Sequence, residues 1–366
     1  MTRRIKILFT IPNFDTAGSG KVVYDLVNGL DKTIFDPEIC CFHDRGDYFK
    51  TIETLGVKIH IFAFTTDYKP FVGFPYRVFK IYKFFKTHHF DLIHSWHWSS
   101  DFSEPLAAKL ARIPFVYTKK AMGWGNKAWR YRSWLSTKII TINNDMQSFF
   151  SRVKHKVVNI PLGVDIGFFK PLERKGVVLE DCKINDNDFI IVSIANLVPV
   201  KGIEILIEAV RLLNNPRIKV FIVGNNENVY GRTLKSKYEN SQFQFLGKKS
   251  DVRPYLAKAN LFVIPTKDEG RKEGLPIAPL EAMASQRVVI GSNISGIKDI
   301  LKPFPECLFK PDDINDLLNS IKLMFEMKTP ERQKLEQAMF IHLHKNFGLK
   351  KCIISHEKLY KSILKY

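Results

Sequence analysis

Short apolar runs alternate with longer amphipathic stretches along the whole chain. Apolar runs of this kind, bounded by Gly, Pro, Asn or Asp, are typical of buried strands. Helical spacing follows many of them, as with the apolar positions of residues 203–210. Strands that alternate with helices indicate parallel sheets and the α/β class. We expect strands at residues 5–11, 38–42, 58–64, 91–94, 113–120, 139–143, 189–195, 220–224, 244–247 and 259–265.

The length of the chain predicts two domains. At 366 residues the chain is long for a single hydrophobic core. The segment 173–188 is charged and poor in apolar residues, which is typical of a linker. We therefore expect an N-terminal domain over residues 1–172, a C-terminal domain over 189–345, and a final helix over 346–366.

Composition restricts the class of protein. Hydrophobic residues make up 45% of the chain, enough for packed cores. The five cysteines are odd in number and lack C-x-x-C spacing, so we expect neither a zinc site nor a disulfide framework, and a reduced cytosol fits best. We expect no signal peptide and no membrane-spanning helix. The net charge of +19 calls for an anionic partner.

The stretch from Thr266 to Ser285 is the strongest candidate site. A short buried strand precedes it, and the residues from Ala278 onward favour a helix, with Pro279 suited to the first turn. Backbone amides at the start of a helix have no internal partner and attract anions, such as a diphosphate. Glu273 and Glu281 stand eight positions apart, on the order of 10 Å along a helix. Carboxylates so placed could hold hydroxyls on either side of the diphosphate of a nucleotide sugar.

The segment Glu273-Gly-Leu-Pro-Ile-Ala-Pro-Leu-Glu281-Ala-Met-Ala resembles the Glu–seven residues–Glu motif of retaining glycosyltransferases of family 4, which have the GT-B fold. The resemblance implies two Rossmann-like domains with parallel sheets facing a central cleft, and a final helix that crosses back to the first domain. It also implies that Glu273 holds the hydroxyls of the donor sugar and Glu281 those of the ribose. The loop residues in contact with the donor would be Gly274, Leu275 and Pro276. The alternative is that both glutamates are solvated surface charges.

Further segments of the second domain resemble the same family. Asn196-Leu-Val-Pro-Val-Lys201-Gly202 is similar to its Gly-Arg-Leu-x-x-x-Lys-Gly signature, in which Lys201 would bind the donor diphosphate. Asn196 replaces a common Arg and can offer only a neutral hydrogen bond. Two further strands end at Gly224 and Gly247, both candidate donor contacts, and the second lies in the region where relatives seat the nucleotide base. Ser295-Gly296-Ile-Lys-Asp299 is similar to the family's Gly-Gly-x-x-Glu.

A glycine-containing loop follows the first strand, with Gly18 and Gly20 ahead of a helix expected from Val22 to Leu30. The spacing does not match a Walker loop or a dinucleotide fingerprint. It resembles the Gly-Gly loop that this family places over the donor phosphate, although Ser19 separates the two glycines. A plain tight turn is the alternative.

Two strands of the first domain end in polar residues. His94 and His97 lie near the end of one, where α/β sheets bind ligands, although a histidine there is as often packed. Lys119 and Lys120 end the next strand, and many relatives carry near position 120 a His that approaches the reacting sugar. Lysines there could hold phosphates, or simply be solvated. We take His97 and Lys120 as candidate catalytic residues.

The resemblance implies retaining transfer of a sugar from a UDP- or GDP-linked donor to an acceptor hydroxyl. The leaving phosphate can itself take the acceptor's proton, and no cofactor or metal is expected. Asp186-Asn-Asp188 has the Asp-x-Asp pattern of metal-dependent enzymes but precedes its strand, so we expect a turn. The alternatives are another enzyme of this fold, such as a sugar-nucleotide epimerase or a phosphorylase, or a basic nucleic-acid-binding module. Nucleic-acid motifs are absent from the sequence, so no nucleic-acid partner is expected.

Residues 69–138 are strongly basic and aromatic, with thirteen Lys/Arg against three Asp/Glu. The predicted helix 76–86 interleaves Lys and Arg with Phe and Tyr, and Trp124, Trp129 and Trp134 follow. Such a surface suits an anionic bilayer. We therefore expect a cytoplasmic protein peripheral on the inner face of the cell membrane, with a lipid-linked or polysaccharide acceptor. The alternative is that the aromatic side chains pack the core and the lysines are solvated.

Overall fold

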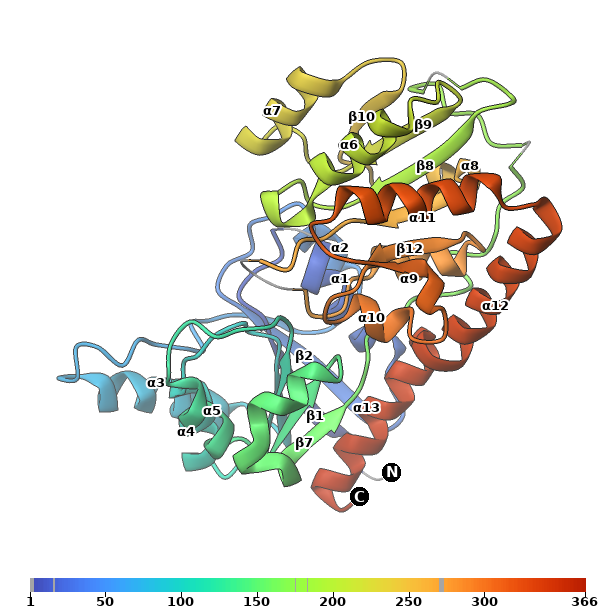
Figure 1. Ribbon diagram of the computed structural model, residues 1–366. Helices are drawn as coiled ribbons and strands as arrows, with labels where there is room; N and C mark the ends of the chain where they lie inside the picture. Colours follow the sequence, from blue (N-terminus) through green and yellow to red (C-terminus); the bar gives the residue numbers. More distant parts are fainter. Residues whose placement is uncertain (1–2, 16, 175, 183, 270–272) are drawn as a thin grey trace. The chain divides into compact units, whose positions relative to one another are not determined.

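The chain forms two compact units, each built on one parallel sheet (Figure 1). The computed structural model describes residues 3–15, 17–174, 176–182, 184–269 and 273–366. Unit 1 comprises Met1–Leu162 and Lys350–Tyr366, and unit 2 comprises Gly163–Leu349. Helices connect the strands in both units, which confirms the α/β class and the two Rossmann-like domains.

The sheet of unit 1 has seven strands in the order β3-β2-β1-β4-β5-β6-β7. The chain runs outward from β1 to β3, then returns to place β4 against the other side of β1. The order therefore reverses between β1 and β4, and such a switch point leaves a crevice at the carboxyl ends of the two strands. The strands are β1 (Ile5–Thr10), β2 (Phe35–Cys41), β3 (Ile59–Ile61), β4 (Leu92–Ser95), β5 (Phe115–Lys119), β6 (Lys138–Thr141) and β7 (Val157–Asn159).

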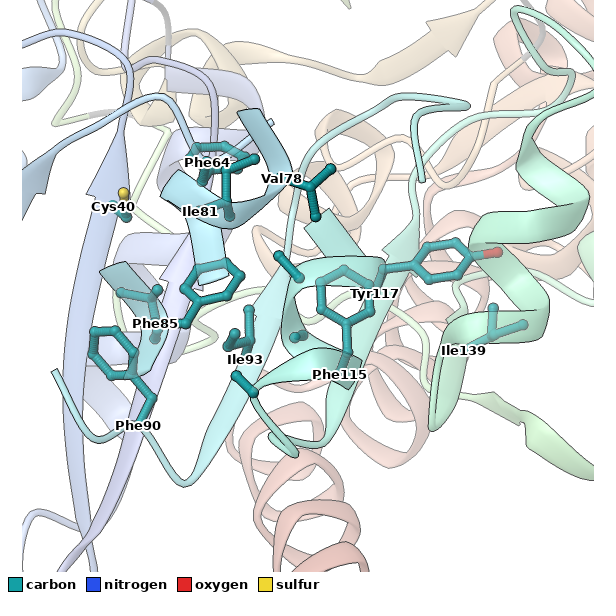
Figure 2. Close-up of a cluster of buried hydrophobic side chains, with 14 of the residues drawn as sticks. Cys40, Phe64, Val78, Ile81, Phe85, Phe90, Ile93, Phe115, Tyr117 and Ile139 are labelled. Atoms are coloured by element: carbon teal, nitrogen blue, oxygen red, sulfur yellow. The ribbon is translucent and has the colours of Figure 1, made fainter. Parts of the chain in front are cut away.

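The helices of unit 1 cover a core of Phe, Ile, Ala and Val side chains (Figure 2). Gly73 turns the chain into α3 with a φ of +84°, and Pro75 occupies the first turn. One side of α3 then buries Val78, Ile81 and Phe85. The helices are α1 (Ala17–Gly29), α2 (Phe49–Glu53), α3 (Phe74–Thr87), α4 (Ser103–Leu110), α5 (Trp129–Leu135), the 3-10 segment η1 (Asp145–Lys156) and the terminal α13 (Leu349–Leu364).

Helix α13 packs on unit 1 through a buried polar contact. The Nδ1 atom of His94 lies 2.6 Å from the hydroxyl of Tyr360, and its Nε2 atom lies 2.8 Å from Oγ1 of Thr118. Burial lowers the pKa of His94 well below its usual value, so the ring is neutral. His94 is thus a packed histidine. A Cβ on Gly29 would lie 2.1 Å from Cδ1 of Ile353, so a larger residue there would require the Ile353 side chain to shift.

The sheet of unit 2 has six strands in the order β10-β9-β8-β11-β12-β13, with its switch point between β8 and β11. The strands are β8 (Phe189–Ile194), β9 (Ile218–Val223), β10 (Phe243–Gly247), β11 (Leu261–Ile264), β12 (Val289–Ser292) and β13 (Leu308–Phe309). The helices are η2 (Pro199–Lys201), α6 (Ile203–Leu213), α7 (Val229–Tyr238), α8 (Arg253–Lys258), α9 (Ala278–Ala284), α10 (Ile297–Ile300), η3 (Pro305–Cys307), α11 (Ile314–Glu326) and α12 (Thr329–Phe347).

The segment 173–188 lies within unit 2 and is bound to it. Arg174 donates to Oδ1 of Asn260 at 2.9 Å, and Asp181 pairs with Lys249 at 2.6 Å. The division between the units falls instead after Leu162 and after Leu349. Across the described residues, every helix falls short of the length and apolar character that a membrane crossing requires.

We expect Tyr360→Phe to destabilise the protein by about 1–3 kcal/mol, because it leaves a buried ring nitrogen of His94 without its hydrogen-bond partner. Chemical denaturation followed by circular dichroism measures the loss. Tyr366→Phe is the matched control, since Tyr366 is 58% exposed. Equal stability of the Tyr360 variant and the wild type would show that the contact contributes nothing.

Candidate active site

The loops that leave β8 and β11 meet at the switch point of unit 2. The backbone N–H of Lys267 donates to the carbonyl of Val200 at 2.8 Å. Gly202 has a φ of +62°, and a Cβ there would lie 2.1 Å from the carbonyl oxygen of Pro265. Only glycine permits both the backbone conformation and the close approach. The start of α6 is therefore held against the loop that carries Glu273.

Lys201 and Glu273 form an ion pair across these two loops. Their side chains keep 20% and 17% of their exposure, so the pair is partly shielded from water while one side stays accessible. A carboxylate and an ammonium in this setting interact more strongly than on an open surface. The structure thus brings together the two residues that sequence analysis assigned to the diphosphate and to the sugar.

A third loop, after β12, closes on the segment that follows Glu273. Gly296 has a φ of +82°, and a Cβ there would lie 2.3 Å from the carbonyl oxygen of Gly274. The side chain of Asp299 accepts from the N–H of Gly296 at 3.2 Å and so holds this turn. Leu275 and Pro276 are buried beneath it. The predicted donor-contact segment is therefore anchored on its apolar side.

Glu281 lies in the first turn of α9 and is partly exposed. Its backbone N–H already donates to the carbonyl of Ile277 at 3.0 Å. Pro279 occupies the first turn, as the sequence predicted. Residues 270–272 of the predicted stretch lie outside the described residues.

Two further glycines mark the ends of β9 and β10. A Cβ on Gly224 would lie 1.8 Å from the carbonyl oxygen of Ala195, so glycine is required for the end of β9 to approach the end of β8. The N–H of Gly224 donates to the carbonyl of Gly247 at 2.9 Å. Asn196, next to Ala195, is exposed at the same edge of the sheet.

Lys267 is a cation at this edge that the sequence analysis missed. Its ammonium lies 2.7 Å from Glu204 and 3.4 Å from Glu269. Glu204 also accepts from the hydroxyl of Tyr230. The available signal was its position, since Lys267 follows the strand β11 by three residues at the switch point.

In unit 1, the carboxyl ends of β4 and β5 line a small pocket. His97 and Lys120 both line it, together with Trp98. The ammonium of Lys120 donates to Oγ of Ser19 at 3.1 Å, which joins the pocket to the glycine-containing loop. The structure therefore places the candidate residues of unit 1 beside its switch point.

The glycine-containing loop differs from the expected one in where its helix begins. Helix α1 starts at Ala17 rather than near Val22, and its regular geometry is broken at Gly18. Gly18 is exposed. Gly20 is buried, and a Cβ there would lie 3.0 Å from Cδ1 of Phe14. The two glycines thus differ in role, because Gly18 allows the break and Gly20 allows close packing.

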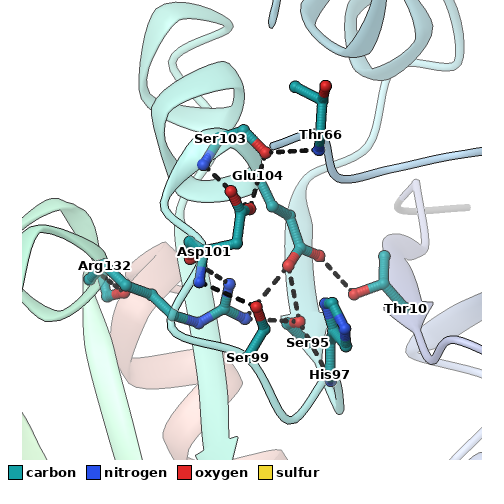
Figure 3. A network of polar contacts seen from close by, with 10 residues as sticks. Thr10, Thr66, Ser95, His97, Ser99, Asp101, Ser103, Glu104 and Arg132 are labelled. Atoms are coloured by element: carbon teal, nitrogen blue, oxygen red, sulfur yellow. Dashed lines mark hydrogen bonds and ion pairs between the residues drawn. The ribbon is translucent and has the colours of Figure 1, made fainter. Parts of the chain in front are cut away.

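A buried polar network supports the end of β4 (Figure 3). The carboxylate of Glu104 accepts from Thr10 at 2.5 Å, from Ser95 at 2.8 Å and from Arg132 at 3.1 Å. Burial raises the pKa of Glu104, while the charge of Arg132 and the two hydroxyls oppose that rise. The N–H of His97 in turn donates to Oγ of Ser95 at 3.4 Å. The network therefore fixes where the chain leaves β4, and the sequence analysis did not detect it.

His97 is neutral at pH 7. Burial, with the positive charges of Arg132 and Lys120, lowers the pKa of His97 to about 3. A ring with so low a pKa is a weak base, so it is suited to hydrogen bonding rather than to taking a full proton.

The Asp186-Asn-Asp188 segment lies in a turn before β8, as expected from its position. Oδ2 of Asp188 accepts from the N–H of Asn185 at 2.8 Å, and Asp188 is buried. That carboxylate is therefore used to close the turn.

The fold and site define a class of enzyme: two Rossmann-like units with charged and glycine residues gathered at their switch points, as in GT-B glycosyltransferases. Residues 16–168 match the family described as Glycosyltransferase Family 4, and residues 179–340 match Glycosyl transferases group 1. The chain belongs to glycosyltransferase family 4.

Solved structures share the fold over nearly the whole chain. A glycosyltransferase from Rickettsia africae is 19% identical with a TM-score of 0.85, covering 99% of this chain and 99% of that one. Anabaena HepE, in complex with UDP and glucose, is 19% identical with a TM-score of 0.79, covering 98% of this chain and 100% of that one.

Two curated relatives are bacterial glycosyltransferases named for lipid-linked acceptors. The Escherichia coli UDP-Gal:alpha-D-GlcNAc-diphosphoundecaprenol alpha-1,3-galactosyltransferase is 26% identical over 269 residues, or 66% of this chain and 68% of that protein. The Campylobacter jejuni N,N'-diacetylbacillosaminyl-diphospho-undecaprenol alpha-1,3-N-acetylgalactosaminyltransferase is 23% identical over 337 residues, or 84% of this chain and 88% of that protein.

The low pKa of His97 predicts a specific dependence of stability on pH. An unfolded histidine titrates near 6.5, so between about pH 3 and 6.5 the unfolded state binds the extra proton and the folded state loses stability as pH falls. At pH 5 this amounts to about 2 kcal/mol relative to pH 7. We expect His97→Gln to lose this part of the pH dependence of the unfolding free energy. The exposed His155→Gln should retain it, and identical slopes for both variants would contradict the assignment.

Proposed function

We propose that this glycosyltransferase moves a sugar from a nucleotide diphosphate donor to a hydroxyl of a lipid-linked acceptor, with retention of configuration at the anomeric carbon and without a metal. The observation that carries the proposal is the Lys201–Glu273 pair at the switch point of unit 2. A donor whose diphosphate displaces the carboxylate from Lys201 would leave Glu273 free to accept hydrogen bonds from the sugar hydroxyls. Both charges of the pair would then be used by one ligand.

The remaining donor contacts follow from the loops around this pair. The ribose hydroxyls would bind Glu281, and the backbone from Gly274 to Pro276 would line the sugar. The nucleotide would lie toward Gly224 and Gly247, at the ends of β9 and β10. A UDP-linked donor is favoured over a GDP-linked one, because the Anabaena neighbour was solved with UDP and the Escherichia coli relative is named for UDP-Gal.

The proposed reaction breaks the bond between the anomeric carbon and the donor phosphate oxygen, and forms a bond from the acceptor oxygen to the same face of that carbon. The acceptor's proton passes to the departing phosphate oxygen. Lys201 stabilises the negative charge that grows on the leaving diphosphate, which is the term that most lowers a barrier of this kind. A neutral His97 does not need to act as base in this scheme, and Lys120 would contribute a fixed positive charge.

The acceptor is proposed to be a glycan on a lipid carrier in bacterial cell-surface polysaccharide synthesis. The names of the Escherichia coli and Campylobacter jejuni relatives both specify a diphosphoundecaprenol acceptor. Such an acceptor is held in the membrane, so the enzyme would work on the cytoplasmic face as a peripheral protein.

Glu281→Ala should weaken UDP binding by about 1.5–3 kcal/mol, the range for hydrogen bonds to a charged group, with the fold retained. Titration calorimetry with UDP and with GDP measures the loss and identifies the base. Glu326→Ala is the matched control, since the Glu326 side chain is 62% exposed on α11 of the same unit. Wild-type affinity for UDP in the Glu281 variant would refute the ribose assignment.

Lys201→Ala should lower kcat more than it raises the donor KM, because the diphosphate charge is largest in the transition state. Steady-state turnover of a UDP-sugar with a short-chain lipid diphosphate acceptor provides the measurement.

In the same assay, activity should persist in EDTA and the product should keep the anomeric configuration of the donor, as read by NMR. An inverted product, or activity lost in EDTA and restored by Mn²⁺, would contradict the mechanism. An epimerised free nucleotide sugar would indicate the other enzyme class.

A further inference from the structure

Large apolar side chains are exposed together on one part of unit 1. They lie in the loop before α3, on α3 itself and on α5. Val72 is 89% exposed and Phe71 is 69% exposed, which is unusual for side chains of this kind in a folded domain. We call the following set the aromatic face: Phe71, Val72, Tyr76, Phe79, Tyr131 and Trp134.

Ring contacts connect Phe71 in the loop to Tyr131 on α5 through two intervening rings. Phe71 lies 5.9 Å from Tyr68 between ring centroids, and Tyr68 lies 6.0 Å from Phe102. Phe102, at the start of α4, lies 5.7 Å from Tyr131. Helices α3, α4 and α5 pack side by side (Figure 1). Phe71 and Tyr131 are thus linked, and the remaining members of the aromatic face lie next to Phe71 in the loop or on α3 and α5, which both pack against α4.

The tip of this surface is held in place by Arg77. Its guanidinium donates to the carbonyl oxygens of Pro70 at 2.8 Å, Asp67 at 3.0 Å and Val72 at 3.4 Å. A loop whose carbonyls are bound in this way presents Phe71 and Val72 outward in a defined position. Exposure of these two side chains is thus built into the structure.

The charge around the aromatic face is positive. Lys80, Lys83 and Lys86 are exposed on α3. The ammonium of Lys80 lies 4.7 Å from the ring centroid of Tyr76, and that of Lys109 lies 4.4 Å from that of Trp134. Long basic side chains beside exposed aromatics can extend to a charged layer while their stems stay on apolar surface.

The few acidic side chains of the same segment do not offset this charge. Residues 69–138 contain thirteen Lys/Arg and three Asp/Glu. Glu104 is fully buried against Arg132. Asp91 pairs with Arg3 at 3.0 Å, and Asp101 accepts from Ser103 at 2.6 Å. An anionic partner is therefore complementary to this surface.

Two of the tryptophans that the sequence analysis assigned to a membrane surface pack inward instead. Trp124 and Trp129 stack with ring centroids 4.6 Å apart and planes 9° apart, against the core of unit 1. Only Trp134 of the three is well exposed, at 60%. Phe71 and Val72 supply exposed apolar surface in their place. No periodic pattern in the sequence predicted that these two side chains would be exposed.

We propose that the aromatic face of unit 1 is a docking surface for an anionic lipid bilayer. Phe71 and Val72 enter the boundary between headgroups and acyl chains, and Lys80, Lys83 and Lys86 contact the anionic headgroups. Aromatic and basic side chains combined in this way suit the interface, and each lysine adds to the affinity. The inference rests on the proposed function and deepens it. Binding to the bilayer would bring the enzyme to the lipid-linked acceptor, which lies in the same bilayer.

Sedimentation with vesicles of phosphatidylglycerol and phosphatidylcholine, free of any acceptor, tests the surface. The wild type should bind at low salt and be released at high salt, as screening weakens the contact of the lysines with the headgroups. Phe71→Ser with Val72→Ser should lower the partition coefficient about tenfold or more. Lys80→Glu with Lys83→Glu should lower it about 30-fold or more.

Matched controls lie on unit 2. Val178→Ser with Val229→Ser removes two side chains that are 80% and 75% exposed, and Lys302→Glu with Lys334→Glu reverses two exposed lysines. Both controls should bind vesicles like the wild type. Equal losses in the control and test variants would overturn the assignment to this surface.

Three other outcomes would overturn the inference. One is a wild type that stays in the supernatant at low salt, and another is equal binding to vesicles of phosphatidylcholine alone. The third is a wild-type dimer in light scattering that Phe71→Ser with Val72→Ser converts to a monomer, because the face would then bind a second copy.

UDP calorimetry on the same variants separates this inference from the proposed function. Loss of vesicle binding with UDP affinity retained supports the surface, whereas a wild type that binds vesicles but neither UDP nor GDP contradicts only the donor assignment.

Discussion

The close approach of backbone to backbone at the ends of β8 and β11 is the constraint on which the site of unit 2 depends. Gly202 lies so near the carbonyl of Pro265 that a single added carbon would collide with it. The loop that carries Lys201 and the loop that carries Glu273 can therefore lie in direct contact at the switch point. Gly296 repeats this device against Gly274, from the side of β12. Glycines at these positions thus contribute geometry, while the charged side chains contribute the chemistry.

In unit 1, a buried charge pair holds the chain in place at the switch point. Glu104 and Arg132 have no exposed side-chain surface, and an unpaired charge in such a place would be strongly destabilising. Their bonds to Thr10 and Ser95 join the ends of β1 and β4, the two strands that flank the switch point. The His97 loop therefore starts from a fixed point. His97 is neutral because burial and two nearby cations both disfavour its protonated form.

On the proposed bilayer surface, too, some residues hold the backbone in place and others are accessible to a ligand. Arg77 uses its charge on backbone carbonyls, so it positions the loop rather than attracting lipid. The lysines on the exposed side of α3 keep their charge at the surface. A basic residue in the sequence can therefore serve either purpose, and only its contacts decide which.

Local pattern by itself determined the α/β class, most strands and the candidate site. Apolar runs set the strands, and the Glu273 to Glu281 segment carried a strand–loop–helix pattern within one continuous stretch. The pattern did not reveal β7 and β13, which have three and two residues and each pair with a single neighbouring strand. Nor could it separate His94, which is packed, from His97, which lines a pocket.

Tertiary structure alone decided the contacts between distant segments. Glu104 meets Arg132 across 28 positions and His94 meets Tyr360 across 266, and no local periodicity encodes either pairing. The same holds for the tryptophans, of which two turn inward and one outward at equal spacing. Side-chain periodicity records only which side of an element is apolar. Which partner that side meets depends on how the whole chain packs, because burial and pairing energies are properties of the assembled core.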